Sequence, residues 1–402
     1  KQTQTKKQTQ TKKQTKTKTY IIKSAYMKSD KIKNILKNDT NSKINWVPFN
    51  SNNNKNQELD WIHTDEKFSF DKSLWKYKAT LKSQVDLNDK TITNKYNLIN
   101  SLLKLKNPRL NKLLLEQYKI NLFNFFNLAK KNKKQNKNQN QLEKILDKYQ
   151  PLFNNNKIWI FKPIFGNEGK DIIIFETYQQ FKKTILSKIN NKENIKKWSR
   201  LNIQRYQKMR NIVKFSYNIE WVLQEYITNP LLYKGKKFHL RSYYVHHIHN
   251  KPDTVNNKSS LKSKNKNYLF ENHRVFTAKK PYQNGDYLNP DIHDTHIKST
   301  PNEINYNPDI IKILTRKQIE NIENQLKLLF NNISKVINLK CYQENKYCYH
   351  VFASDIMITD DYQIKLIELN TKPGMGEYPK QKVDYPHLVF KLIVDKIVNY
   401  HF

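Results

Sequence analysis

Residues 355–370 read DIMITDDYQIKLIELN, and this stretch carries the strongest prediction about the fold. Apolar residues dominate both halves, and the polar cluster at 359–363 predicts a turn between two strands. Side chains along a strand alternate between its two faces, so Glu368 and Asn370 share one face. Folding the chain at the turn brings Asp355 opposite or nearly opposite Glu368. The stretch therefore predicts a β-hairpin with an acidic face.

The acidic face of this hairpin predicts a metal site. Cross-strand neighbours lie about 5 Å apart, which gathers two carboxylates and one amide oxygen around a point. Oxygen ligands without His or Cys suit Mg²⁺, which keeps several waters and binds substrate phosphates. Buried like charges are costly unless they are paired or bind a metal. We therefore interpret Asp355, Glu368 and Asn370 as a magnesium site. The alternative is that they are ordinary polar residues on a solvated face.

A second signal is a glycine loop between two short apolar runs. The runs 158–161 and 172–175 predict strands, and Gly166 and Gly169 lie between them. A P-loop has four residues between its glycines and then opens a helix, so this spacing argues against a Walker-type NTPase. Bare backbone amides in a hairpin loop still bind phosphates. Lys162, at the end of the first run, is placed to reach them. A plain surface hairpin is the alternative.

A third signal is a strand with alternating cations. Residues 221–227 and 237–245 both predict strands, and period-two alternation sets Lys237, His239 and Arg241 on one face of the second. A face of this kind meets anions. The pattern is weak alone, because half-exposed antiparallel strands show it routinely.

The remaining elements mix helices and strands without the regular alternation of a doubly wound sheet, which favours an α+β fold. We expect helices at 97–128, 142–149, 311–337 and 387–400, and strands at 351–358 and 364–370. Polar tracts at 130–141 and 250–267 predict expanded loops.

Composition limits the class of protein. The 402 residues include 73 basic and 35 acidic side chains, for a net charge of +38, and 12% are aromatic. The length predicts two or three domains with a packed core. The charge favours nucleic acid, an anionic membrane or an acidic protein tail as partner, and it does not choose among them. The absence of a recognition-helix, zinc-finger or aromatic RNA-binding signature argues against specific nucleic-acid binding.

Cysteines and hydropathy bear on the compartment. Cys341 and Cys348 are too few for a disulfide framework and do not form a C-x-x-C pair, so we expect free thiols in a reducing compartment. No run of about 18 apolar residues predicts a membrane span.

Five motifs in chain order resemble the tubulin tyrosine ligase-like family of ATP-grasp ligases. They are W-I-x-K-P from Trp159 with the glycines after it, Q-x-Y-I-x-N-P-L-L from Gln224, K-F-x-L-R from Lys237 with Arg274 beyond it, H-x-x-S from His296, and D then E-x-N-x-x-P from Asp355 and Glu368. The resemblance covers roughly residues 95–395. It implies an α+β ATP-grasp fold that holds the nucleotide between two antiparallel sheets.

The resemblance also implies a division of the chain and a role for each motif residue. The expected units are an N-terminal subdomain at 20–105, a central subdomain at 106–230 and a C-terminal subdomain with the metal site at 231–402. Residues 1–19 contain only Lys, Gln and Thr, and this composition independently predicts a disordered basic tail. The residues expected to bind ATP are Lys162, Gly166, Gly169, Lys170, Gln224, Glu225, Tyr226, Ile227, Lys237 and His239. Arg241 and Arg274 are expected to hold carboxylate and acyl-phosphate groups, a task suited to the guanidinium fork.

Two positions depart from the family pattern. The family usually has Asp where this chain has His239, and it often has H-L-T-N where this chain has His296-Ile-Lys298-Ser. Both positions belong to the ATP pocket, so nucleotide geometry or activity is expected to differ. The complete metal trio favours an active enzyme.

The leading hypothesis is an ATP- and Mg²⁺-dependent ligase that adds an amino acid to an acidic protein tail such as that of tubulin. Glutamate is the favoured amino acid. The γ-phosphate would move to a carboxylate, and an amine would attack the acyl phosphate. The resemblance implies a cytoplasmic, microtubule-associated protein with no specific nucleic-acid partner. The alternative is a catalytically weak module whose basic surface binds microtubules or another polyanion.

Overall fold

The computed structural model describes the chain in segments, and the structural statements below concern these residues. They are 18–23, 27, 29–39, 44–46, 59–64, 79–83, 95–134, 140–164, 171–191, 193–194, 219–249, 265–295, 309–337, 341, 347–371, 373–375 and 383–401.

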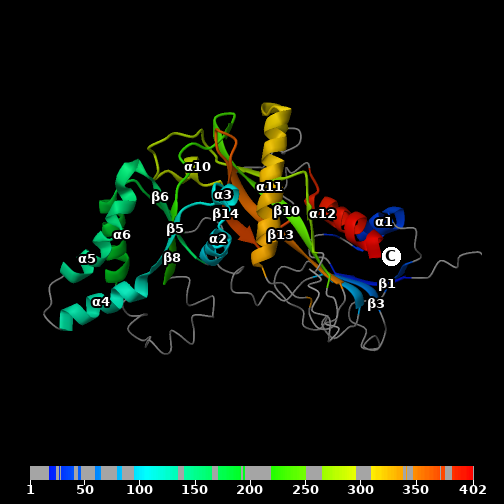
Figure 1. The fold of residues 1–402 in the computed structure, drawn as a ribbon, viewed down its shortest axis with the longest axis horizontal. Coiled ribbons are helices and arrows are strands. Elements are labelled where there is room, and N and C mark those ends of the chain that lie inside the picture. Colours follow the sequence, from blue (N-terminus) through cyan, green and yellow to red (C-terminus); the bar gives the residue numbers. More distant parts are fainter. Residues whose placement is uncertain are drawn as a thin grey trace, which may run out of the picture.

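The larger of two sheets runs through the middle of the molecule and has ten strands among the described residues (Figure 1). Its central pair is β10 (Lys236–His249) and β13 (Tyr347–Ile358), which run antiparallel. Strands β9 (Leu232–Tyr233), β11 (Lys266–Leu269) and β12 (Arg274–Thr277) also pair antiparallel with β10. The alternating stretch that predicted a cationic strand is thus one of the two central strands of the larger sheet.

The acidic hairpin forms as predicted. Strand β13 turns at residues 359–363 and returns as β14 (Ile364–Asn370), and Asp355 lies directly opposite Glu368. Tyr362 adopts the left-handed backbone conformation in the turn, with φ of +62°. The register shifts between residues 355 and 356, which marks a β-bulge beside the acidic pair. Bulges re-aim side chains, and they are common next to functional sites.

The N-terminal strands extend the same sheet and make it mixed. Strand β4 (Ala79–Ser83) pairs parallel with β13, and β3 (Leu59–Thr64), β1 (Lys18–Lys23) and β2 (Ile44–Trp46) continue outward, also in parallel. The antiparallel arrangement expected for this sheet therefore holds for the half that contains β9 to β14, and the N-terminal strands add a parallel section.

The smaller sheet has four described strands, and all its pairings are antiparallel. Its order is β5 (Gln117–Asn121), β8 (Glu220–Glu225), β6 (Trp159–Pro163) and β7 (Ile173–Phe175). Chain residues 226–231 then lead from β8 to β9, and so from one sheet to the other. The subdomain boundaries expected from the sequence stay a prediction.

Helices α4 (Leu122–Lys134), α5 (Asn140–Asp147) and α6 (Tyr178–Asn190) lie beside the smaller sheet (Figure 1). The shared core is rich in aromatic residues, and the rings of Phe161 and Trp221 stack with centroids 4.5 Å apart. A 3-10 helix at Gln150–Asn156 leads into β6.

The helical prediction for 97–128 is wrong in its middle. The structure has α2 (Lys95–Leu103), the short α3 (Pro108–Asn111), then β5 and α4. Residues 117–121 form a strand because β8 supplies a full antiparallel partner. A partner strand from distant sequence outweighs local propensity, and single-chain periodicity does not show it.

Helix α11 (Arg316–Val336) covers one face of the larger sheet (Figure 1). It begins with a capping box in which Thr315 and Gln318 each bond the backbone of the other. Its apolar face, including Leu326 and Leu329, is buried against β10 and β13. A 3-10 turn at Ile311–Ile313 precedes it.

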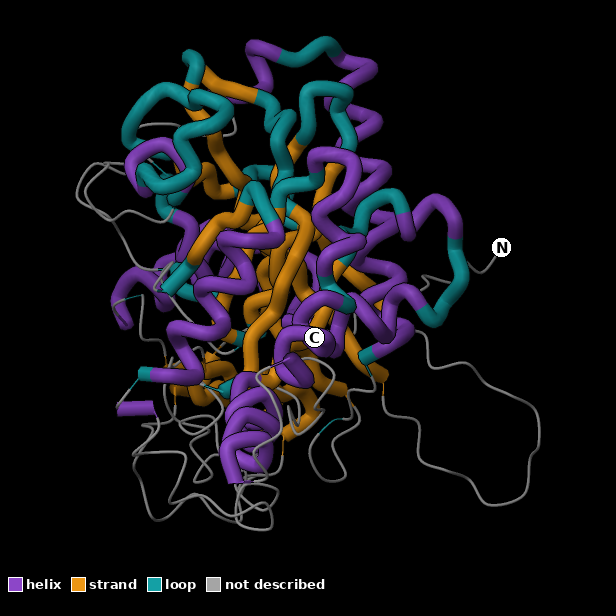
Figure 2. Tube along the Cα trace, turned by 90° about the vertical axis from the view of Figure 1, so that its left-hand side faces the viewer, coloured by secondary structure: helices purple, strands orange, loops and turns teal. Residues whose placement is uncertain are grey.

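The opposite face of the sheet carries α1 (Ser29–Asp39) and α12 (Tyr385–Ile393). A π-helical stretch at Val394–Val398 and α13 (Asn399–His401) complete the described C-terminal segment. Figure 2 shows the strands enclosed by helices on both sides. No helix among the described residues is long and apolar enough to cross a membrane.

The prediction of free thiols is wrong for this structure. Cys341 and Cys348 form a disulfide, with Cα atoms 5.5 Å apart. Cys348 lies at the start of β13 and Cys341 lies beyond the end of α11, so the hydrophobic core brings them together. The spacing of the two cysteines in the sequence did not predict this bond, because tertiary packing buries both thiols and brings them together.

The low-complexity tracts lie largely outside the described residues. Strand β1 begins at Lys18, so the last two residues of the expected basic tail belong to it, and residues 1–17 are not described. Helix α4 continues into the 130–141 tract, and β11 begins at the end of the 250–267 tract.

Candidate functional site

A cavity of about 320 Å³ lies between the two sheets. The smaller sheet contributes Ile160 and Lys162 from β6, and the larger sheet contributes Lys237, Met357 and Glu368. The remaining lining residues are Lys95, Ile172, Ile173, Ile174, Tyr226, Tyr287, Leu288, Pro290, His293, Asp294, Thr295 and Ile367. Two sheets with a buried cavity between them thus bring together motifs that are far apart in the sequence.

Charged side chains gather at one part of this cavity. Nζ of Lys95 lies 2.7 Å from Oε2 of Glu368, and both side chains are largely buried. Burial opposes ionisation of Glu368, but Lys95 and Lys162 hold its pKa below the ordinary value. Burial, reinforced by Lys95, lowers the pKa of Lys162 to about 8. Two lysines therefore face a carboxylate inside a space that is open to a ligand.

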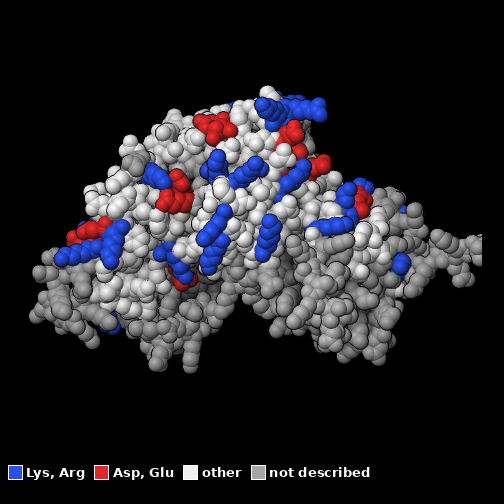
Figure 3. Space-filling model, in the orientation of Figure 1, with Lys and Arg blue, Asp and Glu red and all other residues white. Residues whose placement is uncertain are grey.

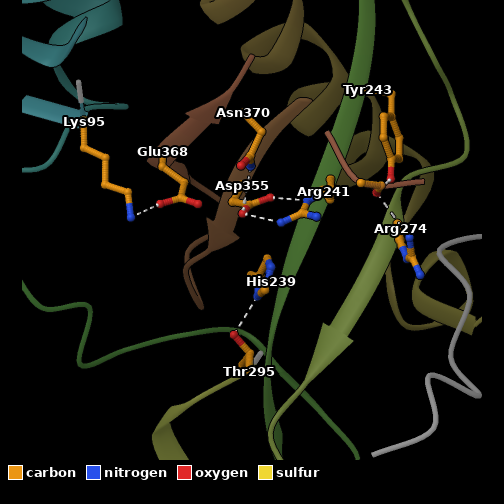
Figure 4. A network of polar contacts seen from close by, with 10 residues as sticks. Lys95, His239, Arg241, Tyr243, Arg274, Thr295, Asp355, Glu368 and Asn370 are labelled. Atoms are coloured by element: carbon orange, nitrogen blue, oxygen red, sulfur yellow. Dashed lines mark hydrogen bonds and ion pairs between the residues drawn. The ribbon is translucent and has the colours of Figure 1, made fainter. Parts of the chain in front are cut away.

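Two of the predicted metal residues, Asp355 and Asn370, form one hydrogen-bonded group with Arg241, whereas Glu368 pairs with Lys95 (Figure 4). Arg241 donates from Nε to Oδ1 of Asp355 at 2.8 Å and from Nη2 to Oδ2 at 2.9 Å. Asn370 donates from Nδ2 to Oδ2 of Asp355 at 3.1 Å. Asp355 is fully buried. Burial alone would lower the pKa of Arg241, but the Asp355 carboxylate raises it above the ordinary value.

The donor set of this group fits a hard divalent cation. Asp355 and Glu368 face each other in register, and the amide of Asn370 turns its nitrogen to Asp355, which leaves its oxygen as a further donor. Arg241 and Lys95 balance the carboxylate charges. Among the described residues, no three His, Cys, Asp or Glu side chains form a metal-binding cluster, so the amide oxygen would have to complete the set.

A separate polar group lines the cavity around Lys237. Its Nζ donates to the hydroxyl of Tyr226 at 2.7 Å, and that hydroxyl lies 2.7 Å from Nδ1 of His293. Arg241 follows Lys237 by four residue steps along β10, which is about 13 Å of extended strand. The ring of Tyr287 stacks on His293 at 5.2 Å. The cavity therefore has an aromatic part around Lys237 and a second part with Lys95, Lys162 and the carboxylate of Glu368.

His239 lies two residues after Lys237, on the same face of β10. Its Nδ1 is 2.6 Å from Oγ1 of Thr295, and its ring stacks on Phe276 at 4.8 Å (Figure 4). Thr295 lines the cavity, and His239 is not among the described lining residues. The substitution of His for the usual Asp thus places an imidazole behind the cavity wall.

Three of the four residues at 224–227 that were expected to bind ATP do not line the cavity. Gln224 is buried within β8, Glu225 lies 3.7 Å from Lys157 at the sheet surface, and Ile227 packs against Met357. Only Tyr226 of this group reaches the cavity with its side chain.

Arg274 lies directly across from Arg241, on β12. Its Nη1 donates to the carbonyl of Gly374 at 3.4 Å, and the Tyr243 hydroxyl donates to the same carbonyl at 3.0 Å (Figure 4). Both guanidinium groups lie over the ring of Phe276. The two arginines therefore form a cationic pair next to the acidic group, with Arg274 buried and Arg241 partly exposed.

The structure tests the position of most predicted site residues and leaves their roles as predictions. It brings Lys162, Tyr226, Lys237 and Glu368 to one cavity, with the Arg241, Asp355 and Asn370 group beside it. Gly166, Gly169 and Lys170, and the departure at His296–Ser299, lie outside the described residues.

Sequence reasoning missed Lys95, His293 and Thr295. Lys95 begins α2, and nothing local marks it as the partner of Glu368. His293 ends the short helix α10 (Pro290–His293), where an Asn-Pro pair signals a helix start but not a cavity wall.

The two sheets with the cavity between them form an ATP-grasp fold. A solved structure with this fold is the C-terminal domain of K. lactis Pby1, described as an ATP-grasp enzyme interacting with the mRNA decapping enzyme Dcp2. The two share 18% identity and a TM-score of 0.57, over 96% of this chain and 94% of that one.

The chain belongs to the tubulin-tyrosine ligase family, whose model matches residues 36–251 and 254–401. A probable tubulin polyglutamylase, ttll-9 of Caenorhabditis elegans, is 20% identical over 60% of this chain and 52% of its own length. A probable alpha-tubulin polyglutamylase, Ttll1 of Tetrahymena thermophila, is 25% identical over 60% and 55%. The probable tubulin--tyrosine ligase PBY1 of Saccharomyces cerevisiae is 22% identical over 61% and 33%. The match thus spans about half or less of each of these relatives.

Proposed function

We propose that this protein is an ATP- and Mg²⁺-dependent ligase that joins an amino acid to a carboxylate of an acidic protein tail. The observation that carries the proposal is the cavity between the sheets, where Lys95 and Lys162 face Glu368 beside the buried group of Asp355 and Asn370. Lysines next to oxygen ligands are what a nucleoside triphosphate with a divalent ion requires.

Each part of the cavity has a role in this proposal. Lys162 and Lys95 would bind phosphate oxygens, and the aromatic part around Tyr226 would hold the base. Asp355, Glu368 and Asn370 would hold magnesium. The bound ion would neutralise phosphate charge during transfer. Since the protein does little covalent chemistry in such a reaction, catalysis would rest on positioning and electrostatic stabilisation.

The proposed reaction has two steps that balance. A carboxylate oxygen of the acceptor attacks the γ-phosphorus, which forms an acyl phosphate and releases ADP. The amine of the incoming amino acid then attacks the acyl carbon, phosphate leaves, and the amine loses a proton. Arg241 and Arg274 would hold the acyl phosphate and the carboxylate, because guanidinium groups bind both through paired hydrogen bonds.

We further propose glutamate as the added amino acid and a tubulin tail as the acceptor. Two of the related proteins carry the name tubulin polyglutamylase. The net charge of +38 would raise the association rate of an acidic tail. Arg109 of α3 and the lysines Lys104, Lys106 and Lys112, which lie just outside α2 and α3, are exposed, and Figure 3 shows basic side chains gathered over the middle of the face that it draws. Such an enzyme would work in the cytoplasm, on microtubules.

The test is an assay of purified protein with ATP, Mg²⁺, tubulin and each amino acid in turn, read by mass spectrometry of the tails. We expect a mass increase of whole glutamate residues. An increase with another amino acid would overturn the choice of glutamate, and no increase with any would overturn the ligase proposal.

The alternative of a polyanion-binding module makes a different prediction. If binding alone is the function, Asp355→Ala and Glu368→Ala should leave cellular function intact. If the protein is a ligase, both changes should abolish function while microtubule binding persists.

A further inference from the structure

A chain of three hydrogen bonds crosses the aromatic part of the cavity. Lys237 Nζ donates to the hydroxyl of Tyr226 at 2.7 Å, and this hydroxyl lies 2.7 Å from Nδ1 of His293. Nε2 of His293 lies 2.7 Å from the backbone carbonyl of Asp286. Lys237, Tyr226 and His293 all line the cavity, so the chain ends at a ligand-facing ammonium.

For a neutral His293 ring, counting hydrogens gives the direction of every bond in this chain. The carbonyl of Asp286 only accepts, so Nε2 of His293 carries the single ring hydrogen and Nδ1 is the acceptor. The Tyr226 hydroxyl therefore donates its single hydrogen to Nδ1. Its lone pairs are then left for the ammonium of Lys237. Burial, reinforced by Lys237, lowers the pKa of His293, which agrees with a neutral ring.

The position of His293 is fixed by its neighbours. Its ring stacks on Tyr287 at 5.2 Å and meets the edge of Tyr282 at 5.7 Å. The Lys237 ammonium also lies 4.1 Å from the centre of the Tyr226 ring. A buried ammonium with these contacts is held at one point rather than free to sample rotamers.

We propose that His293 is a positioning residue that, through the hydroxyl of Tyr226, keeps Lys237 a charged hydrogen-bond donor toward the base of the bound nucleotide. The inference rests on the proposed function, since it needs a nucleotide in this cavity. Without an acceptor at position 293, the Tyr226 hydrogen can turn toward Lys237 and favour its neutral amine. The base would then meet a weaker and misdirected donor.

The charge of Lys237 gives the inference a pH signature. Burial lowers the pKa of Lys237 to about 7, and the nearby Asp294 opposes this shift. The titratable groups that face the chain from neighbouring segments are Tyr282, Tyr287, Asp286 and Asp294. Because the charged form is lost as pH rises through the pKa, nucleotide affinity should fall above neutral pH. Removing the acceptor at position 293 should move this alkaline limb of the binding profile, the pH range in which affinity is lost, to lower pH.

The experiment compares three substitutions that keep different parts of the imidazole. His293→Asn places an amide oxygen near the position of Nδ1 and keeps the acceptor. His293→Gln places an amide nitrogen near Nε2 and keeps only the donor, and His293→Phe keeps only the ring. The dissociation constant of a non-hydrolysable ATP analogue is measured by calorimetry from pH 6 to 9 for the full chain.

We expect His293→Gln and His293→Phe to weaken binding about 10- to 100-fold near pH 7.5, the range of a hydrogen bond to a charged group. Both should shift the alkaline limb to lower pH. His293→Asn should bind the analogue with nearly the wild-type affinity and with the wild-type pH dependence. In a Tyr226→Phe background the position-293 variants should add little, because His293 acts through that hydroxyl.

The outcomes separate the inference from the proposed function. Full affinity in His293→Phe, or equal losses in His293→Asn and His293→Gln, would show that the residue only fills space, and would overturn the inference alone. No binding of the analogue by the wild-type protein would overturn the proposed function, and the inference with it. The ¹⁵N spectrum of His293 in the ligand-free protein adds a direct check, since a hydrogen on Nδ1 contradicts the inference and one on Nε2 supports it.

Discussion

Arg241 donates two parallel hydrogen bonds of 2.8 and 2.9 Å to the carboxylate of Asp355, and Asp355 has no solvent exposure. The two residues lie directly opposite each other on β10 and β13, the central pair of the larger sheet. A charge-assisted, bidentate pair of this kind is among the stronger polar contacts in proteins. The pair joins Arg241, which is expected to bind the acyl phosphate, and Asp355, which is expected to bind the metal, in a single rigid unit.

Breaking this pair should cost stability, and replacing both partners should not. Arg241→Met leaves a buried carboxylate without its cation, so we expect the free energy of unfolding to fall by about 3 to 5 kcal/mol. The double variant Arg241→Met with Asp355→Leu should recover most of that loss, because no buried charge remains. Urea unfolding followed by fluorescence measures both. If the double variant is less stable than Arg241→Met, the pair is a net source of stability and this prediction fails.

The Lys95 and Glu368 pair should separate metal binding from phosphate binding. Glu368→Gln removes a metal ligand, so we expect the rate to fall at least about 100-fold, since even outer-shell partners of a metal cost about 10- to 100-fold. Lys95→Met should raise KM for ATP without weakening Mg²⁺ activation, because Lys95 competes with the ion for Glu368. The rate is measured against Mg²⁺ at fixed ATP, and then against ATP at fixed Mg²⁺. A weaker Mg²⁺ response in Lys95→Met would contradict this assignment.

The sequence predicted the site where its signals are local. The hairpin that pairs Asp355 with Glu368 follows from period-two alternation and a polar turn, both readable within sixteen consecutive residues. The cationic face of Lys237 and Arg241 follows from the same alternation. In these cases backbone geometry sets the arrangement before any tertiary contact forms.

The parts that the sequence did not predict depend on contacts between distant segments. Lys95 comes to Glu368 only because α2 packs against β14. Cys341 meets Cys348 only because α11 ends beside the start of β13. Strand β5 exists because β8 offers it a partner. Each of these is an effect of tertiary structure, for which one sequence holds no periodic signal.

Acid should destabilise the protein through His273. Burial lowers its pKa to about 3, against about 6.5 in an unfolded chain. Between these values the unfolded chain takes up a proton that the folded protein does not, so stability falls as pH falls below about 6.5. At pH 5 the loss should be about 2 kcal/mol relative to pH 7.5. His273→Asn should remove this slope in urea unfolding.

Ser242→Ala is the matched control for His273. The Ser242 hydroxyl lies 2.7 Å from Nδ1 of His273, so this change removes a hydrogen bond but leaves the ring buried. We expect the pH slope to persist in this variant, since burial is the cause of the shift. A slope that disappears in Ser242→Ala as well would assign the effect to the hydrogen bond instead.

Reduction of the Cys341–Cys348 disulfide should loosen the junction between α11 and β13 without disturbing the cavity. The bond closes a short loop with a sequence separation of 7, for which chain entropy predicts a stabilisation of about 2 to 3 kcal/mol. Intact mass before and after a reductant should differ by two hydrogens, and the midpoint of urea unfolding should fall. The double variant Cys341→Ser with Cys348→Ser should match the reduced protein in stability and should not respond to the reductant. Its affinity for nucleotide should equal that of the wild type, because neither cysteine lines the cavity. An unchanged mass on reduction would show that the thiols are free, as composition alone suggested.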